Sequence, residues 1–238
     1  MPLKHTPVVL LHGAGGSQHH WGGVAAHLRR DVTREVTPIE LPGHGDAPGV
    51  VPETLSQALE SIDAAIPGAR PVSLVGHSLG GLLAIAWALS RPGRVARLGL
   101  VATSPRMTLH PDFVARIRDA SFTRGDVRAM FGGDDVPATA VDLVFDDFKR
   151  LRFGTTSLFD VGRPLDVRGR LERLDVPTLV IGPAKDVVTS PRHGRAIAAA
   201  VPHAALCTIA GAGHYVHLER PAEVAQVLTP FLTGAQNG

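Results

Sequence analysis

PVSLVGHSLGG, residues 71–81, joins an apolar run to a helical pattern through the sequence Gly-x-Ser-x-Gly. Residues 71–75 predict a buried strand, and the apolar spacing of three and four over residues 79–90 predicts a helix. A serine on such a sharp strand-to-helix turn is exposed for reaction, and glycines two positions to either side let strand and helix crowd together. This context predicts a nucleophile at Ser78, the alternative being a serine that only caps the helix.

The same alternation of short apolar runs and helical patterns continues along the chain of 238 residues. Strands are predicted at residues 7–11, 35–40, 71–76, 95–101, 177–181 and 204–209. Helices are predicted at residues 54–66, 79–90, 191–200 and 221–232. Parallel strands joined by crossover helices are buried on both faces, which agrees with the continuous apolar runs. We therefore expect an α/β protein with a mostly parallel, doubly wound sheet flanked by helices.

Residues 105–173 break this rhythm, because Gly and Pro separate short helical patterns there and no convincing strand occurs. We expect a helical cap subdomain at residues 105–173, inserted into a core of residues 1–104 and 174–238. Seven of the eight Phe residues lie in this cap. Either they bury one another to hold a small subdomain together, or some of them line an apolar substrate cavity. For a substrate-binding role we expect Phe113, Phe131, Phe145 and Phe153.

The overall composition excludes several classes of function. Lys and Arg total 24 against 22 Asp and Glu, so the chain lacks the basic surface of a nucleic-acid binder, and we expect no nucleic-acid partner. Cys207 is the only cysteine, which excludes an internal disulfide. The first apolar run is too short for a signal peptide or a membrane span. We expect a cytoplasmic protein with no membrane partner.

A serine hydroxyl is a poor nucleophile unless a neighbouring base takes its proton during the attack. His214 follows the last predicted strand in a glycine-containing loop, and Asp186 follows the predicted strand at residues 177–181. Sites in open α/β sheets collect outside the carboxyl ends of the strands. We therefore expect His214 to be the general base and Asp186 to be the carboxylate that orients it.

Other polar residues near these loops are assigned structural roles. His77 should point away from the nucleophile and pack, and His12 should support the loop after the first strand. Glu40 precedes a tight turn and should brace that loop. Two pairs of histidines have a spacing found in metal sites, but neither has an obvious third ligand nearby: His19 with His20, and His214 with His217. We expect no metal and no other cofactor.

These residues stand in five motifs that follow one another in a fixed order. They are LHGAGG (11–16), LPGHG (41–45), GHSLGG (76–81), VPTLVI (176–181), and GH (213–214) leading into LERP (218–221). Together they resemble the α/β-hydrolase superfamily, specifically its small members with a helical cap, over nearly the whole chain. The resemblance implies a triad of Ser78, Asp186 and His214, in the chain order typical of that fold. It also implies an oxyanion hole formed by the amides of Leu79 and Ala14, with Gly15 as the second choice.

Two positions depart from the family's pattern. Glu40 stands where the family usually has Asp, and three residues instead of two separate Gly182 from Asp186. The strand and the turn still align if the glycine is displaced by one position. No carboxylate occurs between Val101 and Asp112, which removes the alternative position for the acid.

The resemblance implies cleavage of a carboxylic ester or thioester of a small, largely apolar substrate through an acyl-enzyme on Ser78. One alternative is a lactonase or a carbon–carbon bond hydrolase with the same triad, and another is a ligand-binding member of the fold with little turnover. The expected partner is a small-molecule ester, thioester or lactone. Three cap arginines are candidates for binding a carboxylate tail: Arg106, Arg150 and Arg152. Nothing in the sequence predicts the oligomeric state.

Overall fold

The structure of the protein, a computed structural model, describes residues 6–31, 35–107, 109–160 and 165–235. Within these ranges six parallel strands form the central sheet in the order β2-β1-β3-β4-β7-β8. They are β1 (Val8–Leu11), β2 (Val36–Ile39), β3 (Val72–His77), β4 (Val95–Val101), β7 (Thr178–Pro183) and β8 (Ala204–Ile209). Their ends lie within two residues of the predicted ones, which confirms the α/β class and the parallel sheet.

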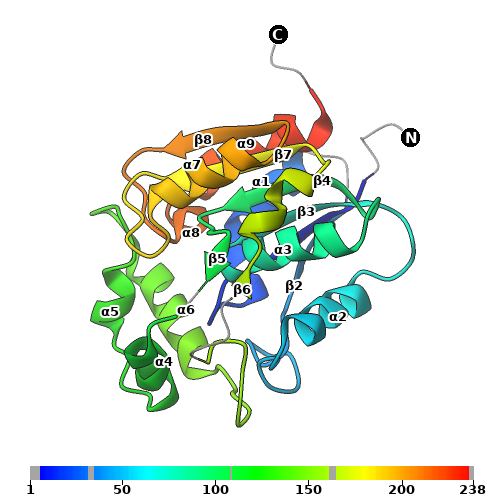
Figure 1. Cartoon of the computed structure of the whole chain (residues 1–238). Coiled ribbons are helices and arrows are strands. Elements are labelled where there is room, and N and C mark those ends of the chain that lie inside the picture. The colour runs from blue at the N-terminus through cyan, green and yellow to red at the C-terminus, as the bar shows by residue number, and fades with distance from the viewer. Residues whose placement is uncertain (1–5, 32–34, 108, 161–164, 236–238) are drawn as a thin grey trace.

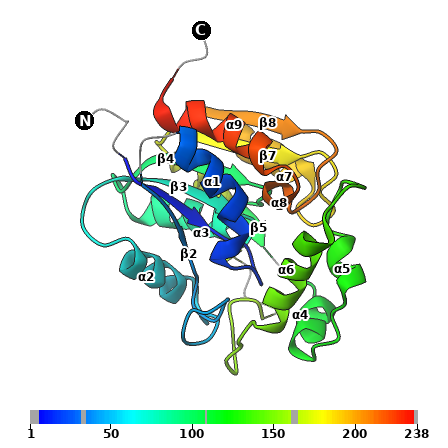
Figure 2. The ribbon, with the colours of Figure 1, turned by 180° about the vertical axis from the view of Figure 1, so that it is seen from behind.

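Helices cover both faces of the sheet, because successive strand residues point to opposite sides. Val8 and Leu10 of β1 pack with α1 and α9, whereas Val9 and Leu11 belong to the cluster of α2, α3 and α7. Figure 1 views the sheet from the side covered by α3, and Figure 2 views it from the opposite side, where α1 and α9 lie in front. The bounds are α1 (Gly22–Asp31), α2 (Leu55–Ala65), α3 (Leu79–Ser90), α7 (Pro191–Ala200) and α9 (Pro221–Thr233). All of the predicted helices therefore form.

The sequence did not predict α1 or the short 3-10 helix η2 (Gln18–Trp21) that precedes it. Gly22 and Gly23 begin α1, and paired glycines are typical of a turn because glycine is a poor helix former. The helix forms because Val24 and Leu28 are completely buried in the layer that also contains α9. Tertiary packing thus outweighs the local preference of the glycines.

In the described part of the cap, helices lie together beyond one end of the sheet in both views (Figures 1 and 2). They are α4 (Pro111–Arg118), α5 (Arg124–Arg128) and α6 (Ala138–Lys149), and the 3-10 helix η3 (Arg168–Arg173) leads back to the core. The expectation that no strand occurs here was wrong, because β5 (Arg106–Met107) pairs antiparallel with β6 (Leu165–Asp166). Strands of two residues are too short to produce an alternating pattern. We propose to retain residues 105–173 as the cap and the flanking segments as the core.

None of the helices in residues 6–31, 35–107, 109–160 and 165–235 combines the length and the apolar character needed to cross a membrane.

Candidate active site

Ser78 lies on the turn between β3 and α3 in a strained backbone conformation, with φ of 50° and ψ of −116°. A β-carbon on Gly76 would lie 2.3 Å from the carbonyl oxygen of Gly80, and one on Gly80 would lie 2.4 Å from the carbonyl oxygen of His12. Only glycine fits at these two close approaches. The Ser78 amide donates to the carbonyl oxygen of Val101 at 3.0 Å, which attaches the turn to β4. This crowding holds Ser78 at the carboxyl end of β3.

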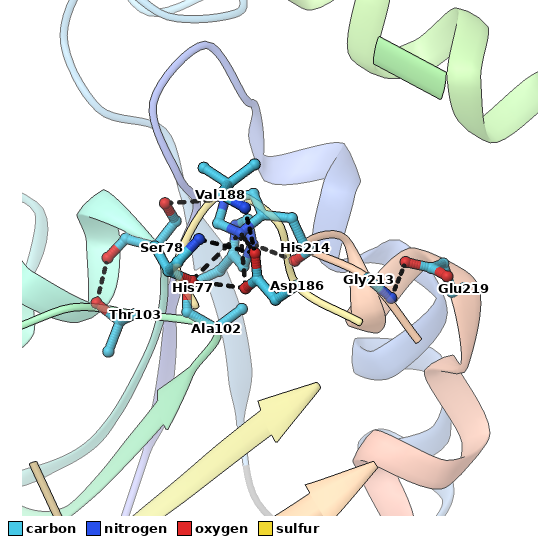
Figure 3. A network of polar contacts seen from close by, with 10 residues as sticks. His77, Ser78, Ala102, Thr103, Asp186, Val188, Gly213, His214 and Glu219 are labelled. Carbon is cyan, nitrogen blue, oxygen red and sulfur yellow. Dashed lines mark hydrogen bonds and ion pairs between the residues drawn. The ribbon is translucent and has the colours of Figure 1, made fainter. Parts of the chain in front are cut away.

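His214 reaches Ser78 from the loop that follows β8 (Figure 3). Its Nε2 lies 3.1 Å from Ser78 Oγ, and its backbone amide donates to the carbonyl oxygen of Met130 in the cap at 2.8 Å. His77 Nε2 donates to the carbonyl oxygen of His214 at 2.9 Å. Burial, and then the neighbouring His217 and His214 rings, lower the pKa of His77 well below its usual value. His77 is therefore a neutral brace beneath His214, in agreement with the packing role predicted for it.

Asp186 contacts the opposite nitrogen of the His214 ring. Its Oδ2 and Oδ1 lie 3.0 and 3.2 Å from His214 Nδ1, and the amides of Val188 and Thr189 each donate to Oδ1 at 2.8 Å. Burial raises the pKa of this carboxyl, but the hydrogen bond and charge of His214 and the donors of Thr189 outweigh burial, so the net pKa lies below its usual value. The Asp186 carboxylate can therefore orient the ring and stabilise a positive charge on it.

The extra residue between Gly182 and Asp186 does not remove the carboxylate from the site. β7 runs two residues further than predicted and ends at Pro183. The amides that follow, those of Ala184 and Lys185, each donate at 2.9 Å to a carbonyl oxygen at or just after the end of β8. These bonds connect the loop that carries Asp186 to the chain that leads to His214.

Two backbone amides near Ser78 are candidates for an oxyanion hole. Leu79 is the first residue of α3, and Ala14 lines the same cavity as Ser78. Neither amide has a hydrogen-bond acceptor among the residues that the structure describes. Gly15 has a φ of 67°, and a β-carbon there would lie 2.2 Å from the ring of Phe148. The amides at a helix N-terminus and in this loop are therefore available to a developing negative charge.

His12 and Glu40 support the loops around the site, as predicted. His12 Nε2 accepts from the Leu41 amide at 3.0 Å, and burial followed by the His44 ring lowers the pKa of His12 well below its usual value. Glu40 accepts from the amides of Gln18 and Asp46 at 3.2 and 3.3 Å. Within the described ranges no group of three or more His, Cys, Asp or Glu side chains has an arrangement that could hold a metal ion.

A cavity of about 360 Å³ lies between the core loops and the cap, and both Ser78 and His214 line it. Its size and its largely apolar wall are typical of sites for small organic molecules. Of the four predicted phenylalanines only Phe113 lines this cavity, and Phe148, which was not predicted, lines it as well. The wall on the cap side includes Arg106, Met107, Leu109, Phe113, Met130 and Phe148.

Phe131, Phe145 and Phe153 do not line this cavity, so the structure does not place them where we expected. Phe131 stacks on Tyr215 with ring centroids 4.9 Å apart. Phe145 packs beneath the guanidinium of Arg124, and Phe153 packs beneath that of Arg118. Aromatic residues in a cap serve its internal packing as well as its cavity, and sequence spacing does not distinguish the two.

Glu219, to which the sequence assigned no role, joins the His214 loop to the cap. It ends α8 (Val216–Glu219), and its buried carboxylate accepts from the amide of Gly213 at 2.9 Å, as Figure 3 shows. It also accepts from the amides of Gly132 and Gly133, each at 3.0 Å. The LERP motif marked this residue, but a motif does not reveal that its carboxylate also accepts from two amides of a distant cap loop.

A second buried contact crosses from core to cap. His20 Nε2, in η2, lies 3.0 Å from Asp147 Oδ2 in α6, and both side chains are at most 2% exposed. Burial raises the pKa of the Asp147 carboxyl, but bonds from His20 and Ser17 outweigh burial and leave the net pKa below its usual value. Phe148, the next residue, therefore reaches the cavity from a helix that is anchored to the core.

Comparison with known proteins gives consistent results for nearly the whole chain. The family model described as alpha/beta hydrolase family matches residues 8–227. A pimeloyl-acyl-carrier-protein methyl ester esterase of Neisseria meningitidis serogroup B is 28% identical over 98% of this chain and 95% of its own length. The esterase of the same name from Stenotrophomonas maltophilia is 31% identical over 94% and 92%. The crystal structure of an enol-lactonase from Burkholderia xenovorans LB400 superposes with a TM-score of 0.79 at 23% identity, over 96% of this chain and 92% of its own.

Proposed function

Because the chain belongs to the alpha/beta hydrolase family and is a hydrolase, we propose that it cleaves a carboxylic ester or thioester of a small, largely apolar substrate through an acyl-enzyme on Ser78. The observation that carries this proposal is the continuous contact from Ser78 Oγ to His214 Nε2 at 3.1 Å and from His214 Nδ1 to Asp186 Oδ2 at 3.0 Å. Such an arrangement provides a nucleophile, its base and the carboxylate that fixes the tautomer of the base.

In the first half of the proposed reaction, Ser78 Oγ attacks the carbonyl carbon while His214 Nε2 takes the hydroxyl proton. The carbonyl oxygen becomes an oxyanion, which the amides of Leu79 and Ala14 bind, with Gly15 as the second choice for the latter. The intermediate collapses as His214 returns the proton to the leaving alcohol or thiol. Asp186 stabilises the imidazolium between these two proton transfers.

In the second half, water attacks the acyl-enzyme and again gives its proton to His214. The tetrahedral intermediate then releases the carboxylic acid and returns the proton to Ser78 Oγ. Water is the only reactant besides the ester, so the proposed reaction requires no cofactor.

The substrate class rests on the cavity and on the relatives. The two curated relatives described above are named as methyl ester esterases, which supports an ester as the substrate. The apolar cap wall, with Phe113 and Phe148, favours an apolar acyl chain. A lactone is a cyclic ester and would undergo the same steps, so a lactonase is the second candidate; a carbon–carbon hydrolase with this triad is the third. A cytoplasmic location remains part of the proposal.

A fluorophosphonate probe tests the assignment, because it phosphonylates an activated serine. We expect labelling of the parent protein at Ser78 and no labelling of the Ser78→Ala variant. A panel of p-nitrophenyl esters, thioesters and lactones then defines the substrate class. An unlabelled parent protein would favour a ligand-binding role with little turnover, and labelling at another serine would refute the proposed nucleophile.

A further inference from the structure

Arg106 is a cation in the cavity wall whose nearest carboxylate already has another partner. Its Nε lies 3.9 Å from Asp166 Oδ2 across the β5–β6 pair, beyond hydrogen-bonding distance. Arg168 donates to both oxygens of Asp166, at 2.5 to 3.0 Å, from its side-chain nitrogens. The Asp166 charge is therefore largely compensated by Arg168, and the guanidinium of Arg106 keeps most of its capacity to bind an anion.

The backbone beneath Arg106 is held in place. The Ser104 hydroxyl donates to the carbonyl oxygen of Arg106 at 2.7 Å and accepts from its amide at 3.3 Å. Ser104 lines the same cavity as Ser78, Arg106 and His214. The arginine side chain thus starts from a fixed point on the wall of the cavity that holds the proposed nucleophile.

Among the described residues, the rest of the cavity wall has no carboxylate that would compete with a bound anion for Arg106, and it carries little other charge. No Asp or Glu lines the cavity among the described residues. Burial, and then the charge of Arg192, lower the pKa of His193 below its usual value, which favours its neutral form. An arginine stays protonated at every accessible pH. Among the described residues of the wall, Arg106 is the one Lys or Arg side chain.

The other two candidate arginines are engaged elsewhere. Arg150 forms ion pairs with Asp46 and, at 3.8 Å, with Asp147. Arg152 donates to backbone carbonyl oxygens of the loop at residues 45–49. Neither lines the cavity. Of the three arginines considered from the sequence, only Arg106 can meet a substrate there.

We propose that Arg106 binds a carboxylate of the substrate, so that the preferred ester carries one negative charge at the end remote from the scissile bond. This inference rests on the proposed esterase function. A single guanidinium matches one carboxylate in a two-pronged hydrogen bond, whereas a phosphate dianion in an otherwise apolar cavity would require further donors. Arg106 would select among esters and take no part in bond cleavage.

The test compares substrates that differ only in this charge. p-Nitrophenyl hydrogen adipate and p-nitrophenyl hexanoate have acyl chains of equal length, with and without a carboxylate. Hexanoyl esters of 4-hydroxybenzoate and 4-hydroxybenzamide place the same difference on the leaving group. Arg106→Gln should lower kcat/KM for the charged member of one pair by about ten-fold and change its neutral partner by less than about two-fold. The pair that responds identifies which end of the ester faces Arg106.

Arg150→Gln is the matched control, because it removes the same charge from the cap outside the cavity. It should change the ratio of charged to neutral substrates by less than about two-fold, and Arg106→Lys should restore part of the ratio. Equal effects of Arg106→Gln on charged and neutral esters in both pairs would overturn the inference, as would equal effects of the two glutamine variants. Failure of the proposed function differs from both, since the parent would then hydrolyse neither neutral ester and Ser78 would resist the fluorophosphonate.

Discussion

The two sides of the cavity are built in different ways. On the core side, Ser78, Asp186 and His214 sit on loops held by backbone hydrogen bonds and by glycines that no other residue can replace. On the cap side, the wall consists mainly of apolar side chains, such as Phe113 and Phe148 from a small aromatic cluster. Under the proposed function, the core side would carry out the chemistry, whereas the cap side would determine which molecules reach it.

The forces within the cap support this distinction. Its surface carries ion pairs such as Arg116–Asp126 and Arg124–Asp142, but ion pairs between exposed side chains contribute little to stability. The aromatic cluster therefore holds the cap together, and apolar contacts tolerate substitution by residues of similar volume. The wall can therefore change without loss of the fold, whereas a change in the proposed triad should leave the fold intact and remove the activity. Five substitutions or conditions, taken from the largest expected effect to the smallest, test this contrast.

Replacing Ser78 by Ala should abolish most of the activity without affecting folding. We expect kcat for a p-nitrophenyl ester to fall by at least about 10⁴-fold, because the nucleophile of the acyl-enzyme is lost. The free energy of unfolding should change by less than about 1 kcal/mol, since serine and alanine share the strain of a positive φ. Ser104→Ala, which alters another serine in the cavity wall, is the control and should keep most of the activity on a neutral ester. Comparable losses in both variants would refute the special role of Ser78.

Adding one methyl group should destabilise the core side strongly and the cap hardly at all. In Gly80→Ala the new β-carbon would lie 2.4 Å from the carbonyl oxygen of His12, so we expect destabilisation of about 3 kcal/mol or more. In Gly169→Ala, within η3 of the cap, the new β-carbon meets nothing within 4 Å, and the stability should change by less than about 1 kcal/mol. Urea denaturation measures both values. Equal stabilities would contradict the close approach at the nucleophile turn.

Acidification should destabilise the core side through its buried histidines. Burial is the main cause that lowers the pKa of His44 from 6.5 to about 4, so between these values the unfolded chain binds a proton that the folded protein does not. The free energy of unfolding therefore falls as the pH drops below about 6.5, and His44 alone accounts for about 2 kcal/mol by pH 5.

Urea midpoints at pH 7 and pH 5 measure this loss. His44→Gln should lose about 2 kcal/mol less than the parent over this interval, because glutamine does not titrate. His110→Gln alters an exposed cap histidine and should follow the parent. A parent protein as stable at pH 5 as at pH 7 would show that these histidines accept protons in the folded state.

Glu219 connects the two regions, so its replacement should affect catalysis through the His214 loop. Both carboxylate oxygens of Glu219 accept hydrogen bonds from backbone amides, and in Glu219→Gln an NH₂ group, which cannot accept, replaces one of them. We therefore expect kcat to fall about ten-fold with little change in KM. Glu223→Gln, in the first turn of α9, is the matched control and should leave both constants within about two-fold. If KM alone rose in Glu219→Gln, the carboxylate would serve the cavity wall instead of the histidine.

Within the cap, substitution of two phenylalanines of α6 should distinguish a side chain that lines the cavity from one that only packs inside the cap. Phe148→Ala enlarges the cavity and should raise KM for p-nitrophenyl hexanoate about five-fold, with a shift of preference toward longer chains. Phe145 lies outside the cavity, so Phe145→Ala should lower the stability without changing the chain-length preference. Identical substrate profiles in the two variants would remove Phe148 from the substrate contact surface.

Sequence patterns predicted the sheet well because buried parallel strands are apolar runs bounded by Gly and Pro. They predicted which loops carry Ser78, Asp186 and His214 because those loops follow strands of one sheet, and the structure brings the three side chains into contact. Patterns failed at α1, where packing outweighs two glycines, and at the two-residue strands β5 and β6.

The cavity wall was harder to predict for a physical reason. Phe131 and Phe148 are both buried cap aromatics, yet only Phe148 reaches the cavity. Burial of an aromatic ring has the same sequence signal whether its neighbour is another cap residue or an empty space. Contacts such as Glu219 with the amides of Gly132 and Gly133 depend on the arrival of a distant loop, which no local pattern encodes.

The same Glu219 contacts limit how this enzyme can be re-engineered by exchanging caps. A β-carbon at Gly132 would lie 2.4 Å from the amide nitrogen of Gly213, so a transplanted segment must place a glycine there and direct two successive amides at one carboxylate. Chimeras that keep the host residues 130–133 and graft foreign sequence on either side should retain a competent histidine. Transplants that replace this short loop would have to bring a matching partner for the host glutamate.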